Sequence, residues 1–197
     1  MTKTLYLMRH GQTLFNKRHR IQGWCDAPLT DLGVYQAQVT RQYFKNAGIT
    51  FDAAYSSTSE RACDTLEIVT NGSLPYQRVK GLKEWNFGTF EGESEDLNPP
   101  LPYEDFFVTY GGESQDQVRE RTAATILQLM QETKGKSVLM VSHGGAMANF
   151  ARAWEDNWRL DNLGHMTNCG ILKFSFEDDQ FYLEEAIGHD FSGWEEK

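Results

Sequence analysis

One short segment near the N-terminus reads Leu5-Tyr6-Leu7-Met8-Arg9-His10-Gly11. An apolar run of strand character, which we expect to span 3–8, ends there on a cation, an imidazole and a glycine. A strand that ends in this way places two anion-binding side chains at the carboxyl edge of a sheet, where open α/β folds bind their ligands. The segment therefore predicts an α/β fold with an anion site at that edge.

A second apolar segment, Ser137–Val141, ends in a similar way, on Ser142-His143-Gly144-Gly145. Two strands that each end in His-Gly predict that two imidazoles meet at one sheet edge, and this favours phosphate chemistry. Either histidine alone would more often be an ordinary, partly buried side chain. The pair, together with Arg9, favours catalysis.

Strand and helix patterns alternate along most of the chain, which is typical of a mainly parallel sheet with helices on both faces. Thr30 is the expected N-cap of a helix that reaches about Asn46. The other expected elements are strand 53–55, a helix from 57 or 58 to about 70, strand 74–79, helix 113–133, strand 137–141, helix 144–154 and a hairpin of 171–176 with 181–186. We therefore expect a three-layer α/β/α sandwich with a mainly parallel sheet, in one domain over 1–197.

The stretch between strand 74–79 and helix 113–133 does not follow this alternation. It contains three prolines within 99–102, followed by the aromatic residues Tyr103, Phe106, Phe107 and Tyr110. An insertion of this length between a strand and a helix is usually either functional or disordered. The aromatic residues favour an ordered flap over 89–112, packed on the main body above the active site.

The composition argues against several classes of function. A length of 197 residues with 40% hydrophobic residues suits one globular domain. No apolar stretch approaches the roughly 20 residues that span a bilayer, and the net charge of −9 argues against a nucleic-acid partner. The three cysteines match no metal-ligand pattern, so we predict reduced thiols, no metal, and a cytoplasmic protein without a signal peptide or membrane partner.

The negative charge is concentrated in one segment. From Glu84 to Val118 there are nine acidic residues and no Lys or Arg, and the other 19 acidic residues equal the 19 Lys and Arg of the chain. If these carboxylates line the pocket, they should repel leaving groups that carry further negative charge. If they face solvent, as charge runs usually do, they should have little effect on specificity.

These motifs, with others in the same order along the chain, make the sequence similar to the histidine phosphatase (phosphoglycerate mutase-like) superfamily. The matching blocks are Leu7–Thr13 with Asn16, Gln22–Trp24, Pro28–Gly33, Tyr55–Ser57, Glu60–Ala62, Leu82–Glu84, Phe87–Gly88, Glu91–Gly92 and Ser142–Gly145. A single Arg-His-Gly would be weak support, whereas several blocks in register are specific.

The resemblance implies roles for five side chains, and the chemistry of each residue type agrees with its role. His10 would attack phosphorus as a neutral imidazole and form a phosphohistidine. Arg9 and Arg61 would hold the phosphoryl oxygens through paired donors, and His143 would donate to the same oxygens. Glu84 would give a proton to the leaving alkoxide.

Other residues receive weaker assignments. Four are expected to bind the substrate: Asn16, Gln22, Gly23 and Gly144. Three histidines match no motif and are expected to be structural: His19, His165 and His189. The resemblance implies no cofactor and no metal, and the expected partner is a small phosphorylated substrate.

The main choice within the family lies between a phosphatase and a cofactor-dependent phosphoglycerate mutase. Mutases of this family hold a second anionic group partly with basic residues in the insertion after the proton-donor glutamate, and here that insertion has none. We therefore predict a metal-independent phosphatase for small phosphomonoesters. A binding protein that holds phosphorylated ligands without turnover is the alternative from another class, although all five catalytic positions are occupied.

Overall fold

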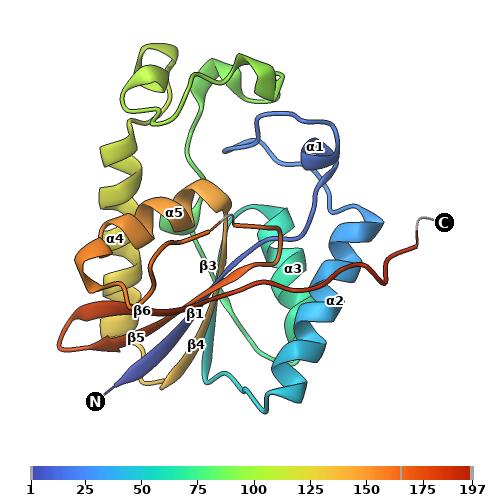
Figure 1. Cartoon of the computed structure of the whole chain (residues 1–197), viewed down its shortest axis with the longest axis vertical. Coiled ribbons are helices and arrows are strands. Elements are labelled where there is room, and N and C mark those ends of the chain that lie inside the picture. The colour runs from blue at the N-terminus through green and yellow to red at the C-terminus, as the bar shows by residue number, and fades with distance from the viewer. Residues whose placement is uncertain (1, 165, 196–197) are drawn as a thin grey trace.

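A computed structural model describes residues 2–164 and 166–195, and it contains a central six-stranded sheet of order β3-β2-β4-β1-β5-β6 (Figure 1). The strands are β1 (Lys3–Arg9), β2 (Ala53–Ser57), β3 (Gln77–Val79), β4 (Ser137–Ser142), β5 (Ile171–Glu177) and β6 (Gln180–Ile187). The first four run parallel, while β5 is antiparallel to β1 and forms a hairpin with β6. The α/β fold and the C-terminal hairpin are thus confirmed. The expectation for His165 lies outside the described residues.

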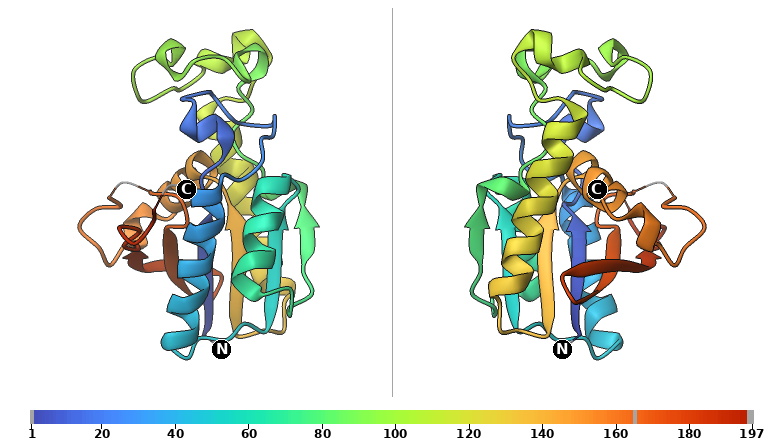
Figure 2. Two further views of the ribbon diagram at one scale, coloured as in Figure 1. Left: turned by 90° about the vertical axis from the view of Figure 1, so that its right-hand side faces the viewer. Right: turned by 90° about the vertical axis from the view of Figure 1, so that its left-hand side faces the viewer.

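Helices cover both faces of this sheet, with α2 and α3 on one face and α4 and α5 on the other (Figure 2). The α-helices are α1 (Leu14–Lys17), α2 (Asp31–Asn46), α3 (Glu60–Thr70), α4 (Gln115–Glu132) and α5 (Gly144–Arg152). Short 3₁₀ helices are η1 (Lys80–Leu82), η2 (Gly88–Phe90), η3 (Glu95–Leu97), η4 (Phe106–Tyr110) and η5 (Glu155–Asn157). Within the described part of the chain, no helix is long and apolar enough to cross a membrane.

The alternating side chains of β1 explain why this strand is apolar along its length. Leu5 and Leu7 pack into the core beneath α4 and α5, whereas Tyr6 and Met8 pack into the core beneath α2 and α3. All four are buried. A parallel strand that is covered on both faces reads as a continuous hydrophobic run, as this one does.

The register between β1 and β4 brings the two His-Gly motifs together. Arg9 pairs with Ser142 in the parallel ladder, so the next residues, His10 and His143, leave the sheet side by side. The His10 backbone N–H donates to the Ser142 carbonyl at 3.1 Å. The predicted meeting of two imidazoles at the carboxyl edge of the sheet is therefore confirmed.

Some element boundaries differ from those expected from the sequence. Strand β2 continues through Ser57, because Ser56 pairs with Val141 of β4 and Ser57 with Val79 of β3, so α3 begins later than expected. Strand β3 is shorter than the expected 74–79. Helix α1 was not expected, because a single turn has no hydrophobic period; a capping box between Thr13 and Asn16 stabilises it.

The segment 89–112 lies above the carboxyl edge of the sheet, beyond the strand ends (green in Figure 1). Its aromatic residues pack into a small core of their own, in which Trp85, Phe107 and Val118 are buried. Partly buried aromatic side chains surround them: Phe87, Phe90 and Tyr103. The segment is therefore ordered by aromatic packing rather than by regular secondary structure.

Candidate active site

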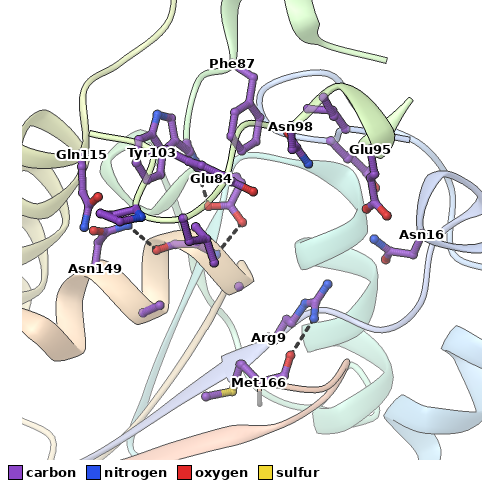
Figure 3. A pocket seen from close by; sticks show the side chains of 18 of the residues that line it. Arg9, Asn16, Glu84, Phe87, Glu95, Asn98, Tyr103, Gln115, Asn149 and Met166 are labelled. Carbon is purple, nitrogen blue, oxygen red and sulfur yellow. Dashed lines mark hydrogen bonds between the residues drawn. The ribbon is translucent and has the colours of Figure 1, made fainter. Parts of the chain in front are cut away.

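A cavity of about 610 Å³ opens at the carboxyl edge of the sheet, between the strand ends and the segment 89–112 (Figure 3). Six of the nine predicted site residues line it: Arg9, His10, Asn16, Gln22, Glu84 and Gly144. Arg61, His143 and Gly23 do not line the cavity, and they lie behind its wall in contact with His10 or with one another.

The hydrogen bonds of His10 determine which ring nitrogen can act as a nucleophile. Its Nδ1 lies 2.7 Å from the Gly11 carbonyl oxygen, which can only accept, so Nδ1 carries the proton. Its Nε2 therefore holds the lone pair, and it accepts from Nε of Arg61 at 3.3 Å. Burial, followed by the charges of Arg61 and Arg9, lowers the pKa of His10 well below its usual value. The imidazole is thus neutral and unprotonated at the nitrogen that faces Arg61.

Arg61 is fully buried, and its guanidinium is surrounded by acceptors. Besides its bond to His10, Nη1 donates to the Cys25 carbonyl at 2.9 Å and to the Asp26 carboxylate at 2.8 Å. Nη2 donates to the Gly23 carbonyl at 2.8 Å. In this structure Arg61 therefore hydrogen-bonds to Nε2 of His10 and does not line the cavity.

His143 is fully buried beside His10. The two imidazole ring centres are 5.1 Å apart, with an angle of 62° between the rings. Its Nε2 pairs with the Ser57 hydroxyl at 2.8 Å, while its Nδ1 has no hydrogen-bond partner among the described residues. Burial, followed by the charges of Arg61, His10 and Arg9, lowers the pKa of His143 well below its usual value.

Three nitrogen atoms at the cavity wall or directly behind it are buried without a hydrogen-bond partner in the described part of the chain: Arg9 Nε, Gln22 Nε2 and His143 Nδ1. Arg9 uses Nη1 to donate to the Met166 carbonyl at 2.7 Å (Figure 3). A buried unpaired donor costs about 1–3 kcal/mol. Unpaired nitrogens around a neutral nucleophile suit a ligand that brings several acceptor oxygens, as a phosphoryl group does.

Glu84 lies on the opposite wall, at the N-terminus of α5 (Figure 3). Its carboxylate accepts backbone N–H bonds from Trp85 at 2.8 Å, Gly145 at 2.8 Å and Ala146 at 2.7 Å. A helix N-terminus stabilises a negative charge in this position. Gly145 permits the contact, because a Cβ atom there would lie 2.7 Å from Glu84 Oε1. The local sequence Gly144-Gly145 therefore lets the carboxylate reach the cavity wall.

Asn16 and Gly23 differ in their relation to the cavity. The Asn16 side chain comes from α1 and accepts through Oδ1 from the Thr13 N–H at 3.1 Å and from Asn168 at 3.3 Å. Its NH₂ group is then the part that can donate to a ligand. Gly23 contributes its carbonyl to Arg61, and a Cβ atom at this position would lie 2.1 Å from the Trp85 carbonyl oxygen. Gly23 therefore supports Arg61 rather than the substrate.

The acidic segment contributes little to the cavity. Of its nine carboxylates, only Glu84 and Glu95 line the wall. Glu113 is paired with Arg121 at 2.8 Å, and most of the others are exposed. Arg20 and Arg152, which lie outside the segment, also line the cavity. Of the two expectations for this charge run, a largely solvated face is the one that the structure supports.

Among residues 2–164 and 166–195, no group of three or more His, Cys, Asp or Glu side chains is placed to hold a metal ion. The three cysteines are free thiols, and burial raises the pKa of Cys25 and of Cys169 to about 12.

One structurally important residue, Glu91, had no role in the sequence-based predictions. Its carboxylate accepts four backbone N–H bonds beside the segment that holds Arg61. The only sequence signal for it was its place in the block Glu91–Gly92.

Known proteins resemble this chain over most of its length. Residues 5–187 match the profile of the histidine phosphatase superfamily (branch 1). A metal-independent phosphoserine phosphatase of Arabidopsis thaliana is 27% identical over 211 residues, which cover 89% of this chain and 88% of that protein.

Solved structures agree in fold. A phosphoglycerate mutase from Bacillus anthracis superposes with a TM-score of 0.82 at 28% identity, covering 97% of this chain and 94% of the other. A phosphoserine phosphatase from Entamoeba histolytica, in complex with 3-phosphoglyceric acid, gives a TM-score of 0.75 at 27% identity, covering 96% and 98% of the two chains.

Proposed function

Because this chain belongs to the histidine phosphatase superfamily, we propose that it hydrolyses small phosphomonoesters through a phosphohistidine on His10. The chain is an enzyme of the metal-independent histidine phosphatase type. The observation that carries the mechanistic proposal is the protonation of His10, whose Nδ1 donates to the Gly11 carbonyl and leaves Nε2 with its lone pair.

In the first step, Nε2 of His10 forms a bond to phosphorus while the bond from phosphorus to the ester oxygen breaks. Glu84, whose carboxylate first takes up a proton from solvent, gives that proton to the ester oxygen, so a neutral alcohol leaves. Arg9 and Gln22 donate to the phosphoryl oxygens from the cavity wall with nitrogens that lack partners in the free enzyme. His143, which lies behind that wall beside His10, would donate through Nδ1 while its Nε2 accepts from the Ser57 hydroxyl.

In the second step, a water oxygen attacks phosphorus and the bond from phosphorus to Nε2 breaks, with its electron pair returning to His10. The Glu84 carboxylate takes the proton from the water and regains its acid form. Inorganic phosphate then leaves, and both residues are ready for another cycle. In the free enzyme Arg61 orients the imidazole through its bond to Nε2; this hydrogen bond is broken while Nε2 is bonded to phosphorus and re-forms when phosphate leaves.

The substrate leaving group would occupy the outer part of the cavity. A volume of about 610 Å³ is larger than a phosphoryl group needs, so the site has room for a sizeable alcohol. Leu101, Pro102 and Tyr103 supply part of that wall from the segment 89–112, which in our proposal acts as a flap. The named activity of the Arabidopsis thaliana relative makes phosphoserine a first candidate.

A phosphoglycerate mutase is the second candidate, and one observation favours it. Arg20 and Arg152 line the cavity and could hold a second anionic group, although the insertion itself has no basic residue. The Bacillus anthracis structure carries the name phosphoglycerate mutase.

The two candidates are separated by assaying the purified protein on a panel of phosphomonoesters, including phosphoserine and an aryl phosphate, with a chelator present. Conversion of 3-phosphoglycerate, primed with 2,3-bisphosphoglycerate, is measured in parallel. Phosphate release with a higher kcat/KM than phosphoglycerate isomerisation supports the phosphatase. The reverse ranking supports the mutase, and no turnover in either assay contradicts both.

A further inference from the structure

Glu91 lies at the start of the segment 89–112, outside the cavity wall, and its carboxylate is an acceptor for four backbone N–H groups. Oε2 accepts from Gly23 and Cys25, both at 3.0 Å. Oε1 accepts from Trp24 at 2.7 Å and from Phe87 at 3.2 Å. Three successive N–H groups that converge on one anion form a backbone nest, so this carboxylate determines the conformation of residues 23–25.

Two of these three residues also supply carbonyl acceptors to Arg61. The Gly23 carbonyl accepts from Nη2 at 2.8 Å, and the Cys25 carbonyl accepts from Nη1 at 2.9 Å. One peptide group is shared by the two ions, because the Gly23 carbonyl bonds to Arg61 while the adjoining Trp24 N–H bonds to Glu91. Its dipole is thus aligned between an anion and a cation.

We propose that Glu91 is a positioning residue for the nucleophile, which holds Arg61 against His10 through the backbone of residues 23–25. This inference rests on the proposed role of His10. Gly23 is part of the device, because a Cβ atom at that position would lie 2.4 Å from Glu91 Oε1 and would displace the carboxylate. Arg61 in turn donates to the His10 nitrogen that attacks phosphorus.

The substitution Glu91→Gln tests this proposal, because an amide keeps the shape but has only one acceptor oxygen for four N–H donors. The matched control is Glu93→Gln. Glu93 lies two positions further along the chain and its side chain is exposed, so this substitution removes the same charge without removing buried contacts. With p-nitrophenyl phosphate we expect kcat to fall about tenfold in E91Q at a nearly unchanged KM, because small misplacements of catalytic groups are costly. E93Q should retain wild-type kcat.

A double-mutant cycle separates positioning from general damage to the fold. If Glu91 acts through Arg61, E91Q should lower kcat in the wild-type background and should have little further effect in an Arg61→Ala background. Equal losses of kcat in both backgrounds would overturn the proposal.

The pKa of His10, measured by NMR titration of its ring nitrogens, gives a readout that does not require turnover. The charged or titratable groups that influence His10 are Arg61 from α3, Arg9 from β1 and His143 from the end of β4. Loss of the Glu91 charge alone would lower the pKa of His10, because an anion stabilises imidazolium. Displacement of Arg61 would raise it, because the Arg61 charge lowers that pKa.

We therefore expect the pKa of His10 to rise in E91Q and not in E93Q. An unchanged or lower pKa in folded E91Q would contradict the proposal, whether or not the enzyme is a phosphatase. If E91Q does not fold, Glu91→Asp serves instead: its shorter carboxylate loses the same N–H bonds while the charge is kept, and the same rise is expected. If the wild type shows no phosphatase activity, the proposed function fails and the titration alone decides this inference.

Discussion

The imidazole ring centres of His10 and His143 lie 5.1 Å apart, although 133 positions separate the two residues in the sequence. Their strands are parallel neighbours in register, so both rings leave the same edge of the sheet. Both are buried, and burial lowers the pKa of each well below its usual value. Two neutral imidazoles can share the site without repulsion, and in our proposal one is the nucleophile and the other a donor.

This pair should make stability depend on pH. The unfolded chain binds a proton at each histidine below about pH 6.5, while the folded chain does not until much lower pH. Stability from these groups is therefore complete above pH 6.5 and decreases as the pH falls, by about 1.4 kcal/mol per pH unit for each proton. Urea unfolding at several pH values gives the slope of the free energy of unfolding against pH. In His143→Asn this slope should be smaller than in the wild type by the contribution of about one proton. An unchanged slope relative to the wild type would contradict burial of His143 as the neutral form.

His10→Ala should abolish the phosphoenzyme. Among the described residues that line the cavity, His10 is the one with an imidazole nitrogen that holds a lone pair, so no acid-labile, base-stable adduct should accumulate in the variant on rapid quench. His19→Ala, which changes an exposed histidine, is the control and should retain the adduct. A phosphoenzyme in the His10 variant would falsify this role.

Arg9→Ala should weaken phosphate and vanadate binding and slow catalysis. Arg9 lines the cavity with an unpaired Nε, so its loss removes a charge-assisted bond that strengthens toward the transition state. We expect a cost of about 3 kcal/mol, roughly a hundredfold in kcat/KM. Calorimetry with vanadate checks the binding. The exposed Arg18, changed to alanine, is the charge-matched control; equal effects of both variants would exclude a direct role for Arg9.

Glu84→Gln should discriminate between leaving groups. An alkyl phosphate releases a strongly basic alkoxide that needs a proton, whereas p-nitrophenolate leaves without one. We therefore expect kcat for the alkyl ester to fall far more than kcat for p-nitrophenyl phosphate. The glutamine still offers one oxygen to the N–H groups at the start of α5. Equal losses on both substrates would indicate that Glu84 acts by position alone.

Arg152→Gln tests whether the outer cavity recognises a second anionic group. Arg152 ends α5, lines the cavity and is exposed, so it can approach a leaving group without loss of structure. If substrates carry a carboxylate, kcat/KM should fall roughly two- to fivefold for phosphoserine or 3-phosphoglycerate, which corresponds to the value of one surface charge contact, up to about 1 kcal/mol. It should stay constant for p-nitrophenyl phosphate. A parallel fall for both substrate types would show that Arg152 does not select for charge.

The sequence alone determined the sheet edge and the chemistry that is gathered there. The apolar run 5–8 can be recognised as part of a buried strand, because burial on both faces of a sheet requires apolar side chains at successive positions. The two His-Gly endings then locate His10 and His143 at one edge, since parallel strands present their carboxyl ends together. Thr30 could also be predicted as the N-cap of a helix, because capping depends only on hydrogen bonds between residues close together in the sequence.

Only the tertiary structure decided which side chains face the substrate and which stand behind it. Arg61 bonds to carbonyls that lie more than thirty residues away in the chain, and Glu91 bonds to N–H groups of the same distant loop. Such long-range pairings leave no periodic signal, because they depend on how separate loops pack. The acidic segment from Glu84 to Val118 could be found in the sequence, but its composition does not predict which carboxylates face the cavity. Their directions depend on the aromatic packing of residues 85–112.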